Sequence, residues 1–485
     1  MPERKPAAWL LAACLSVLPL AAANAAPLAP CVLSGVPHEA LCGSVSRALD
    51  PARPQGPRID VHFAVLPALA RRKKPDPVFF LAGGPGQSAV ALAGPVGAML
   101  SRLGQRRDLV FVDQRGTGRS APLTCEAPAA GAPLRDSLDP AAQRRRAEAC
   151  LLRLQALPHG DLRHYGTTVA MADLDAVRAA LGAERINLVA ASYGTRAALE
   201  YTRLYPQQVR RLVLDGVVPP DMGLPLAAVP DTQAAFDALL AACRADSACQ
   251  ARHPTLAMQW QLLRAMLPRT VRITHPLTGL PESIELDADM LASLVRAALY
   301  TPVTASALPA AIEAAAAGRF EPLVGLAASL GAPRGPMAIA QGQHFSVVCS
   351  EDLPADGVGA PPSAFAGLPQ LYGEVCARWP RAAVDPAFRQ VPAAPAAALL
   401  WSGGIDPATP PRHGERVAQA LGPLARHEVV PQAGHGLLAL PCVRDAVFRF
   451  VDAADDAAAL QVDTGCARAL PRPPAFEPPA VRRQP

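Results

Sequence analysis

The sequence predicts an α/β fold built on a doubly wound, mostly parallel sheet, and three observations lead to it. Short runs of β-branched and aromatic residues end at turns rich in glycine and aspartate, which is typical of buried parallel strands. Stretches with apolar residues at helical spacing lie between these runs. A long segment rich in alanine and leucine then interrupts the alternation before the last two strands.

The strands are predicted from their apolar runs and from the turns that follow them. In chain order they are residues 78–81, 109–112, 186–189, 212–214, 398–401 and 427–430. Helices are expected at residues 169–181, 195–205 and 414–421. Functional groups of such a sheet gather at the carboxyl ends of its strands, so the site is expected in the turns after these runs.

The interrupting segment is too long for a loop and is interpreted as a mainly helical cap. Its helical patches are residues 232–243, 259–266 and 288–300, and residues 273–284 are expected to form a small hairpin. The chain is therefore divided into residues 26–220 and 391–485, which form the two parts of the core, and residues 221–390, which form the cap.

The composition excludes several classes of protein. Apolar residues make up 51% of the chain and charged residues 18%, so a large core is expected and global disorder is excluded. The formal charge of +5 comes from scattered arginines without a basic stripe or an aromatic platform, which argues against a nucleic-acid partner. The oligomeric state cannot be predicted from the sequence.

Residues 1–25 are interpreted as a signal peptide. Arg4 and Lys5 precede an apolar stretch that ends at the small-x-small site Ala23-Asn24-Ala25. A membrane anchor and a lipoprotein attached at Cys14 are the alternatives. After this stretch no apolar run reaches membrane-spanning length, so stable membrane insertion is not expected. The predicted location is periplasmic or secreted.

Cysteine usage agrees with export. Removal of Cys14 with the signal peptide reduces the 11 cysteines to an even set of ten, which suggests disulfides. Sequence alone does not fix the connectivity, but the spacing suggests the neighbouring pairs 31–42, 125–150, 243–249, 349–376 and 442–466. Neither C-x-x-C nor H-E-x-x-H occurs, so no metal site is predicted.

A candidate nucleophile stands between a predicted strand and a predicted helix. The segment Ala190-Ala191-Ser192-Tyr193-Gly194 has the context of a nucleophile elbow, a sharp turn that needs small residues two positions before and after the serine. Gly194 meets this requirement, and Ala190 replaces the usual glycine. The alternative interpretation is an ordinary serine in a strand–helix turn.

Two later strand ends supply an acid and a base. Asp406 follows the next-to-last predicted strand and His435 follows the last, which gives the chain order Ser, Asp, His. His435 would take the proton of Ser192, and Asp406 would orient and stabilise the imidazole. Asp215, after the strand that follows the serine, is the alternative acid.

An oxyanion needs two preorganised N–H donors. The backbone N–H of Tyr193 is one candidate, and Gly83 or Gly84, in the loop after an earlier strand, supplies the other. The sequence does not decide between the two glycines.

Together these motifs resemble the exported tripeptidyl-aminopeptidase and proline-iminopeptidase-like branch of the α/β-hydrolases, peptidase family S33. The resemblance covers most of the chain after residue 25 and rests on residues 83–86, 113–120, 192–194, 348–352, 406–410 and 434–436, with Asp173, Leu174 and Arg178. It implies an α/β-hydrolase fold and hydrolysis of short peptides from a free N-terminus, with no cofactor. Asp113 and Arg115 are expected to shape a strand-end loop.

The resemblance also implies carboxylates that hold the substrate ammonium, for which Glu351 and Asp352 are the candidates; the alternative is that both are solvated loop residues. Ala82 stands where the iminopeptidase motif usually has histidine, so strict proline specificity is not expected. An esterase or lipase with the same triad is the alternative function, and an inactive binding protein is a third.

Overall fold

The computed structural model describes residues 28–129, 131–329, 335–353 and 363–476. The predicted signal peptide and Cys14 lie outside the described residues.

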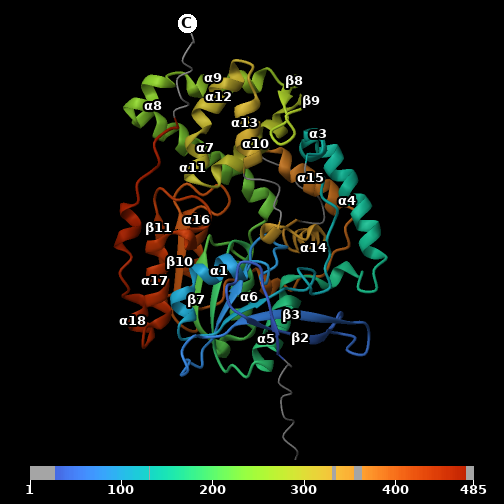
Figure 1. Ribbon diagram of the computed structural model, residues 1–485, viewed down its shortest axis with the longest axis vertical. Helices are drawn as coiled ribbons and strands as arrows, with labels where there is room; N and C mark the ends of the chain where they lie inside the picture. Colours follow the sequence, from blue (N-terminus) through green and yellow to red (C-terminus); the bar gives the residue numbers. More distant parts are fainter. Residues whose placement is uncertain (1–27, 130, 330–334, 354–362, 477–485) are drawn as a thin grey trace, which may run out of the picture.

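A sheet of nine strands forms the centre of the described part of the chain, in the order β1-β2-β3-β5-β4-β6-β7-β10-β11 (Figure 1). From β5 to β11 all neighbouring strands are parallel, whereas β1, β2 and β3 form an antiparallel extension at one edge. The bounds are β1 Ala29–Cys31, β2 Ala40–Ala48, β3 Arg58–Leu66, β4 Val78–Leu81, β5 Leu109–Val112, β6 Ile186–Ala191, β7 Val209–Asp215, β10 Ala398–Gly403 and β11 Ala425–Val430.

The six predicted strands are β4, β5, β6, β7, β10 and β11, and the bounds of β4 and β5 agree with the prediction to the residue. All four residues of β4 and all four of β5 are buried, as expected for strands covered on both faces. The antiparallel strands β1 to β3 were not predicted, because their polar and apolar residues are mixed and no glycine-rich turn marks their ends.

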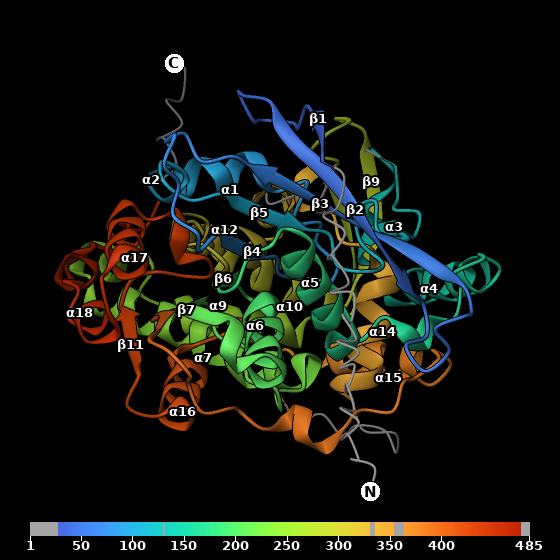
Figure 2. The same cartoon turned by 90° about the horizontal axis from the view of Figure 1, so that it is seen from below.

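Helices cover both faces of the sheet, so the fold is doubly wound (Figure 2). One face packs against α5 (Thr167–Ala180), α6 (Tyr193–Leu204) and α16 (Pro411–Leu421). The other packs against α1 (Ala93–Met99), α2 (Ser101–Gly104), α17 (Pro441–Asp452) and α18 (Asp456–Leu460). Each face has its own buried apolar cluster, and these clusters hold the strand ends in fixed positions.

A mainly helical segment is inserted between β7 and β10 and stands over one end of the sheet (Figure 1). Much of it packs around a separate apolar cluster that includes Phe236, Trp260 and Leu291. The expected hairpin is present as β8 and β9, which pair antiparallel. The bounds are α7 Leu224–Ala245, α8 Ser247–Arg252, α9 Leu256–Ala265, β8 Arg269–Thr274, β9 Pro281–Leu286, α10 Ala288–Leu299, α11 Pro302–Ser306, α12 Leu308–Ala316, α13 Glu321–Ser329, α14 Gln341–Glu351 and α15 Gly367–Cys376.

Two helices from the N-terminal half join this inserted segment. They are α3 (Leu134–Leu138) and α4 (Pro140–Gln155). The N–H of Leu134 donates to Glu282 at 2.9 Å, and Arg144 of α4 forms an ion pair with Glu374 of α15. The division of the chain at residues 221 and 390 stays a prediction; the structure adds that the region above the sheet also draws on residues before 221.

Short 3-10 helices complete the fold. They are η1 Leu162–His164, η2 Pro206–Gln208, η3 Gly335–Met337, η4 Pro386–Arg389, η5 Leu437–Ala439 and η6 Gly465–Ala469. Across the described ranges, no helix combines the length and the apolar character that a membrane crossing needs.

The ten cysteines after Cys14 form five disulfides, and the pairs are those that the spacing suggested: Cys31–Cys42, Cys125–Cys150, Cys243–Cys249, Cys349–Cys376 and Cys442–Cys466. Each joins residues that are close in sequence, from 6 to 27 positions apart.

Thiol titration tests this pairing. Protein that begins after residue 25, unfolded in guanidinium without reductant, should show no free thiol. Reduction should lower the melting temperature, because a cross-link across a loop such as Cys125–Cys150, 25 residues apart, contributes about 3 kcal/mol in the chain-entropy description. One or more thiols per chain before reduction would contradict the pairing.

Candidate active site

Ser192 occupies a sharp turn at the carboxyl end of the central strand β6. The strand ends at Ala191 and α6 begins at Tyr193, so the serine alone makes the turn. Its φ of 55° and ψ of −128° place a non-glycine residue in a rarely populated region, which costs free energy. Gly194 must be small because a Cβ there would lie 2.3 Å from the carbonyl oxygen of Leu81. This local geometry matches the predicted elbow.

Ser192 lines a cavity of about 230 Å³ between the edge of the sheet and the inserted helices. Much of the wall is apolar, with side chains such as Val218, Met222 and Ile339. Its larger polar side chains are Arg296, Tyr300, His344 and Tyr372. Among the described residues that line this cavity, none is Asp or Glu.

Asp406 and His435 form a pair at the ends of β10 and β11. The Nδ1 atom of His435 lies 2.8 Å from Oδ2 of Asp406. The side chain of Asp406 is fully buried, and its Oδ1 accepts the N–H groups of Ala408 at 2.7 Å and Thr409 at 2.9 Å. The hydroxyl of Thr409 donates to Oδ2 at 2.7 Å. The carboxylate is thus fixed by its own turn before it meets the imidazole.

This pairing shifts both pKa values. Burial alone would lower the pKa of His435, but the charge and hydrogen bond of Asp406 outweigh burial and raise it above its ordinary value. Burial alone would raise the pKa of Asp406, and the adjacent imidazole together with the N–H donors of Thr409 and Ala408 lowers it instead. The arrangement stabilises the ion pair of carboxylate and imidazolium.

The imidazole is positioned by the inserted segment as well as by the sheet. The N–H of His435 donates to the carbonyl of Tyr300 at 2.9 Å, and the two rings meet edge to face with centroids 5.4 Å apart. Arg296 in turn donates to the Tyr300 hydroxyl at 3.0 Å. A Cβ at Gly434 would lie 2.3 Å from the carbonyl of Tyr300, so this close approach requires glycine.

Ser192 and His435 both border the turn after β7. The N–H of Ser192 donates to the carbonyl of Asp215 at 2.8 Å. A Cβ on the next residue, Gly216, would lie 3.2 Å from a ring carbon of His435 and 3.0 Å from the hydroxyl of Thr409. The structure therefore brings the predicted serine, acid and histidine to one region of the sheet edge.

The alternative acid, Asp215, has different partners. Its two carboxylate oxygens accept the N–H groups of Leu437 at 3.0 Å and Leu438 at 2.8 Å. Burial raises its pKa, and these two donors oppose the rise. Asp215 thus holds the turn that follows His435, while Asp406 makes the direct contact with the imidazole.

The predicted oxyanion donors lie close to Ser192, and one of them borders the same cavity. Tyr193 is the first residue of α6, where backbone N–H groups have no partner within the helix. Gly84 lines the cavity, and a Cβ on Gly83 would lie 3.1 Å from Cβ of Ser192. Both glycines are in the turn after β4. Gly83 is the one close to Ser192, and Gly84 is the one that lines the cavity.

Glu351 and Asp352 are not solvated loop residues, and the structure does not direct them into the cavity. Glu351 is buried and accepts the N–H of Thr167 at 2.6 Å and its hydroxyl at 2.7 Å. The same threonine hydroxyl lies 2.7 Å from the hydroxyl of Tyr193. Asp352 is buried and forms an ion pair with Arg196 of α6. Both carboxylates have internal partners that connect α14 with the serine helix, so no observed contact supports the predicted ammonium anchor.

Asp113 and Arg115 shape their loop, as expected. Asp113 accepts from the Ser88 hydroxyl and from the N–H groups of Val90 and Arg119. Arg115 is buried and pairs with Asp173 through two of its nitrogens, at 2.7 and 3.0 Å. These contacts attach the turn after β5 to α5.

Thr409, Arg296 and Tyr300 were not predicted as site residues. Thr409 has a local signal, since a hydroxyl three residues after an aspartate in a turn is placed to donate back to it. Arg296 and Tyr300 have the i, i+4 spacing of residues on one helix face. That spacing alone does not show which part of the protein the face contacts. Within the described part of the chain, no three His, Cys, Asp or Glu side chains are grouped as metal ligands would be.

Comparison with known proteins agrees with this geometry. Residues 76–306 match the family model described as alpha/beta hydrolase fold, and residues 363–459 match the model described as TAP-like protein. The two matches together cover more than half of the chain and contain Ser192, Asp406 and His435. The chain is an α/β-hydrolase. It belongs to the branch with a TAP-like C-terminal region, within peptidase family S33.

Individual relatives are peptidases by name. Tripeptidyl aminopeptidase of Streptomyces lividans is 32% identical over 200 residues, which are 38% of this chain and 36% of the relative. Serine protease Hip1 of Mycobacterium tuberculosis is 31% identical over 229 residues, 44% of this chain and 43% of the relative. The chain thus spans less than half the length of these curated relatives. The crystal structure of proline iminopeptidase from Mycobacterium smegmatis has 19% identity and a TM-score of 0.41, and covers 86% of this chain and all of its own.

The carboxylate of Asp406 is predicted to set the acid limb of the pH–activity profile. Activity should fall at low pH with a midpoint above the ordinary histidine value of 6.5, because Asp406 raises the pKa of His435. Asp406→Asn should lower kcat by about 10⁴-fold. It should also move the midpoint to lower pH, measured from kcat/KM between pH 5 and 9. An unchanged midpoint would contradict the pairing.

The buried carboxyl of Glu351 is predicted to make stability depend on pH. Burial raises its pKa from 4.5 to about 7, so between these values the native state holds a proton that the unfolded chain releases. Its contribution to the free energy of unfolding is present below pH 4.5 and is lost as pH rises through 7. Glu351→Gln can keep the hydrogen bonds to Thr167 without the charge.

Urea unfolding at pH 5 and pH 7.5 tests this point. The natural protein should lose more stability between the two pH values than Glu351→Gln does. Equal losses in both proteins would show that Glu351 does not titrate in this range.

Proposed function

We propose that this chain is an exported serine aminopeptidase that releases short peptides or single residues from a free N-terminus through an acyl-enzyme on Ser192. The observation that supports it most is the Asp406–His435 pair, 2.8 Å apart, at the strand edge where Ser192 makes its turn beside a cavity. No cofactor is required for this chemistry.

The first half-reaction forms the acyl-enzyme. Oγ of Ser192 attacks the carbonyl carbon of the scissile bond while Nε2 of His435 takes its proton. The bond from Nδ1 to Asp406 keeps Nε2 free to accept that proton and stabilises the resulting imidazolium. The carbonyl oxygen becomes an oxyanion, which the N–H of Tyr193 and an N–H of Gly83 or Gly84 would stabilise. His435 then protonates the leaving amine, and the C–N bond breaks.

The second half-reaction restores the enzyme. A water molecule gives its proton to His435 and attacks the acyl carbon, the oxyanion forms again, and the proton returns to Oγ of Ser192 as the carboxylic acid leaves. The turn geometry of Ser192 assists both half-reactions. Because φ and ψ of Ser192 are already fixed before the substrate binds, the serine loses little conformational entropy when it reacts.

Peptides are proposed as the substrates because several relatives that match the sequence are named tripeptidyl aminopeptidase or serine protease. The small cavity, about 230 Å³ and covered by the inserted helices, favours short or narrow substrates over folded proteins. Export is proposed from residues 1–25, and the five disulfides are compatible with an oxidising compartment.

A carboxylic-ester hydrolase is the second candidate function, and one observation favours it. The described lining of the cavity contains Arg296 but no carboxylate that could pair with a substrate ammonium. An unpaired ammonium in such a cavity would be unfavourable, whereas a neutral ester has no such requirement. The two functions therefore differ in their dependence on a free N-terminus.

Hydrolysis assays separate the two candidates. The aminopeptidase should cleave aminoacyl or tripeptidyl anilides with a free N-terminus, and N-acetylation of the same anilides should abolish cleavage. Equal cleavage of free and acetylated anilides, or cleavage of simple esters alone, would contradict the aminopeptidase and favour the ester hydrolase.

The serine is tested by Ser192→Ala, which should lower kcat by about 10⁴-fold or more on every substrate. Ser293→Ala, at an exposed position of α10, is the matched control and should keep full activity. Full activity of Ser192→Ala would overturn the assignment of the nucleophile.

A further inference from the structure

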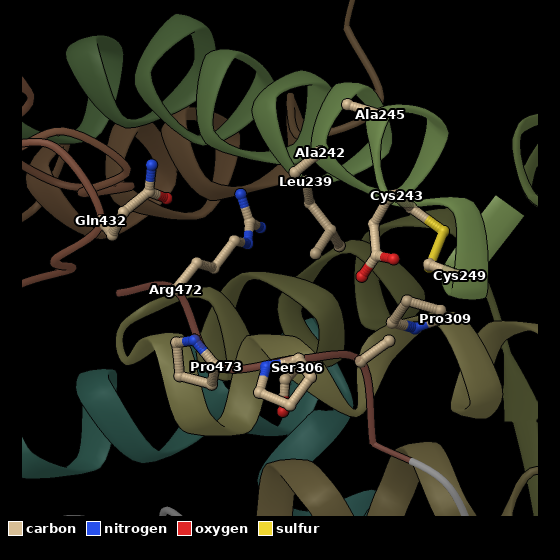
Figure 3. A pocket seen from close by; sticks show the side chains of 13 residues that line it. Leu239, Ala242, Cys243, Ala245, Cys249, Ser306, Pro309, Gln432, Arg472 and Pro473 are labelled. Carbon is tan, nitrogen blue, oxygen red and sulfur yellow. A yellow bond between two sulfur atoms is a disulfide. The ribbon is translucent and has the colours of Figure 1, made fainter. Parts of the chain in front are cut away.

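A second cavity, of about 520 Å³, lies where the C-terminal segment meets the inserted helices (Figure 3). Its walls come from the end of α7 and the turn to α8, from α11 and α12, from the loop after β11, and from residues 472–475. No residue that lines it also lines the cavity beside Ser192. It is therefore a separate site, and the proposed hydrolysis makes no use of it.

Several contacts hold the walls of this cavity in place. The disulfide Cys243–Cys249 joins α7 to α8 on one side. On another side the N–H of Phe476 donates to the carbonyl of Ser306 at 2.9 Å, and Ala475 packs against the apolar cluster of the inserted segment. The cavity is thus formed before any ligand enters, which reduces the entropic cost of binding.

Arg472 brings a positive charge to this cavity. Its side chain is partly buried, and among the described residues it has neither a hydrogen bond nor an ion pair. Burial lowers the pKa of its guanidinium, so the charged form is less well solvated than at the surface. Figure 3 shows the guanidinium extending into the cavity, with the amide of Gln432 toward the same end. An anionic group here would gain two donors and neutralise the charge.

The other end of the cavity has the opposite charge. Cys243 and Cys249 lie away from Gln432 in Figure 3, and Asp246, between them in sequence, also lines the cavity. One oxygen of Asp246 accepts the N–H of Ala248 at 3.0 Å and so caps α8, while its side chain stays exposed at the rim. Within the described ranges, Asp246 and Arg472 form no ion pair with each other.

We propose that this cavity binds a short zwitterionic peptide, with its C-terminal carboxylate at Arg472 and Gln432 and its ammonium at Asp246. The cavity has the volume of ordinary small-molecule sites, about 300–1,000 Å³. Its apolar wall, which includes Leu239 and Pro309, suits small aliphatic side chains between the two charged ends.

Tri-alanine is the probe, and calorimetric titration is the measurement. The background is Ser192→Ala, so that the peptide is not consumed. Adding Arg472→Gln should remove one binding event or weaken it by on the order of tenfold, because a charge-assisted hydrogen bond is lost. The matched control is Arg468→Gln, on the same segment, whose side chain is directed to Glu428 and not to the cavity; it should leave the titration unchanged.

Peptides with one blocked terminus test which terminus of the peptide binds at Arg472 and which binds at Asp246. Tri-alanine amide should bind more weakly than tri-alanine to the Ser192→Ala protein, and Arg472→Gln should remove that difference. N-acetyl-tri-alanine should also bind more weakly, and Asp246→Asn should remove that difference while keeping the cap of α8, since asparagine caps helices as well as aspartate does.

Identical titrations with and without Arg472→Gln would overturn the proposal, because the peptide would then bind only elsewhere, such as beside Ser192. That result would leave the proposed function intact. Conversely, the proposed function alone would be contradicted if the natural chain cleaved none of the anilides while the titrations still showed binding that depends on Arg472.

Discussion

The buried pair of Asp406 and His435 is the interaction on which the rest of the site depends. A buried carboxylate is costly unless every oxygen has a partner, and here Ala408, Thr409 and the imidazole supply them. The pair also requires His435 to stay at one place and orientation. That constraint explains why the loop after β11 is held from two sides, by Tyr300 of the inserted segment and by the carboxylate of Asp215.

The parallel sheet makes this constraint possible, because it delivers residues distant in sequence to one edge. The ends of β4, β6, β7, β10 and β11 supply, in turn, the Gly83-Gly84 loop, Ser192, Asp215, Asp406 and His435. The inserted helices add the remaining walls. Contacts of Glu351 and Asp352 with Thr167 and Arg196 connect α14 with the helix that follows Ser192, so the inserted helices over the cavity and the helix after Ser192 share one buried polar network.

Sequence reasoning singled out Ser192, Asp406 and His435 because each follows the carboxyl end of a predicted strand, in the chain order Ser, Asp, His. It did not find β1 to β3, whose residues are mixed in polarity, nor the association of α3 and α4 with the inserted segment, which depends on long-range packing. It also could not show that Glu351 and Asp352 have internal partners, since Thr167 and Arg196 are far away in sequence. Arg472 gave no signal, because only the fold reveals that it lines a cavity and that no described residue forms an ion pair with it.

Labelling with a fluorophosphonate, followed by mass spectrometric mapping, tests whether Ser192 and His435 act together. The reagent reacts with serines whose proton is taken by an adjacent base, so we expect one adduct per chain, on Ser192, and its near-complete loss in His435→Ala. An adduct on another serine, or no adduct on natively folded protein, would contradict the assignment of Ser192, His435 and Asp406 as one catalytic unit.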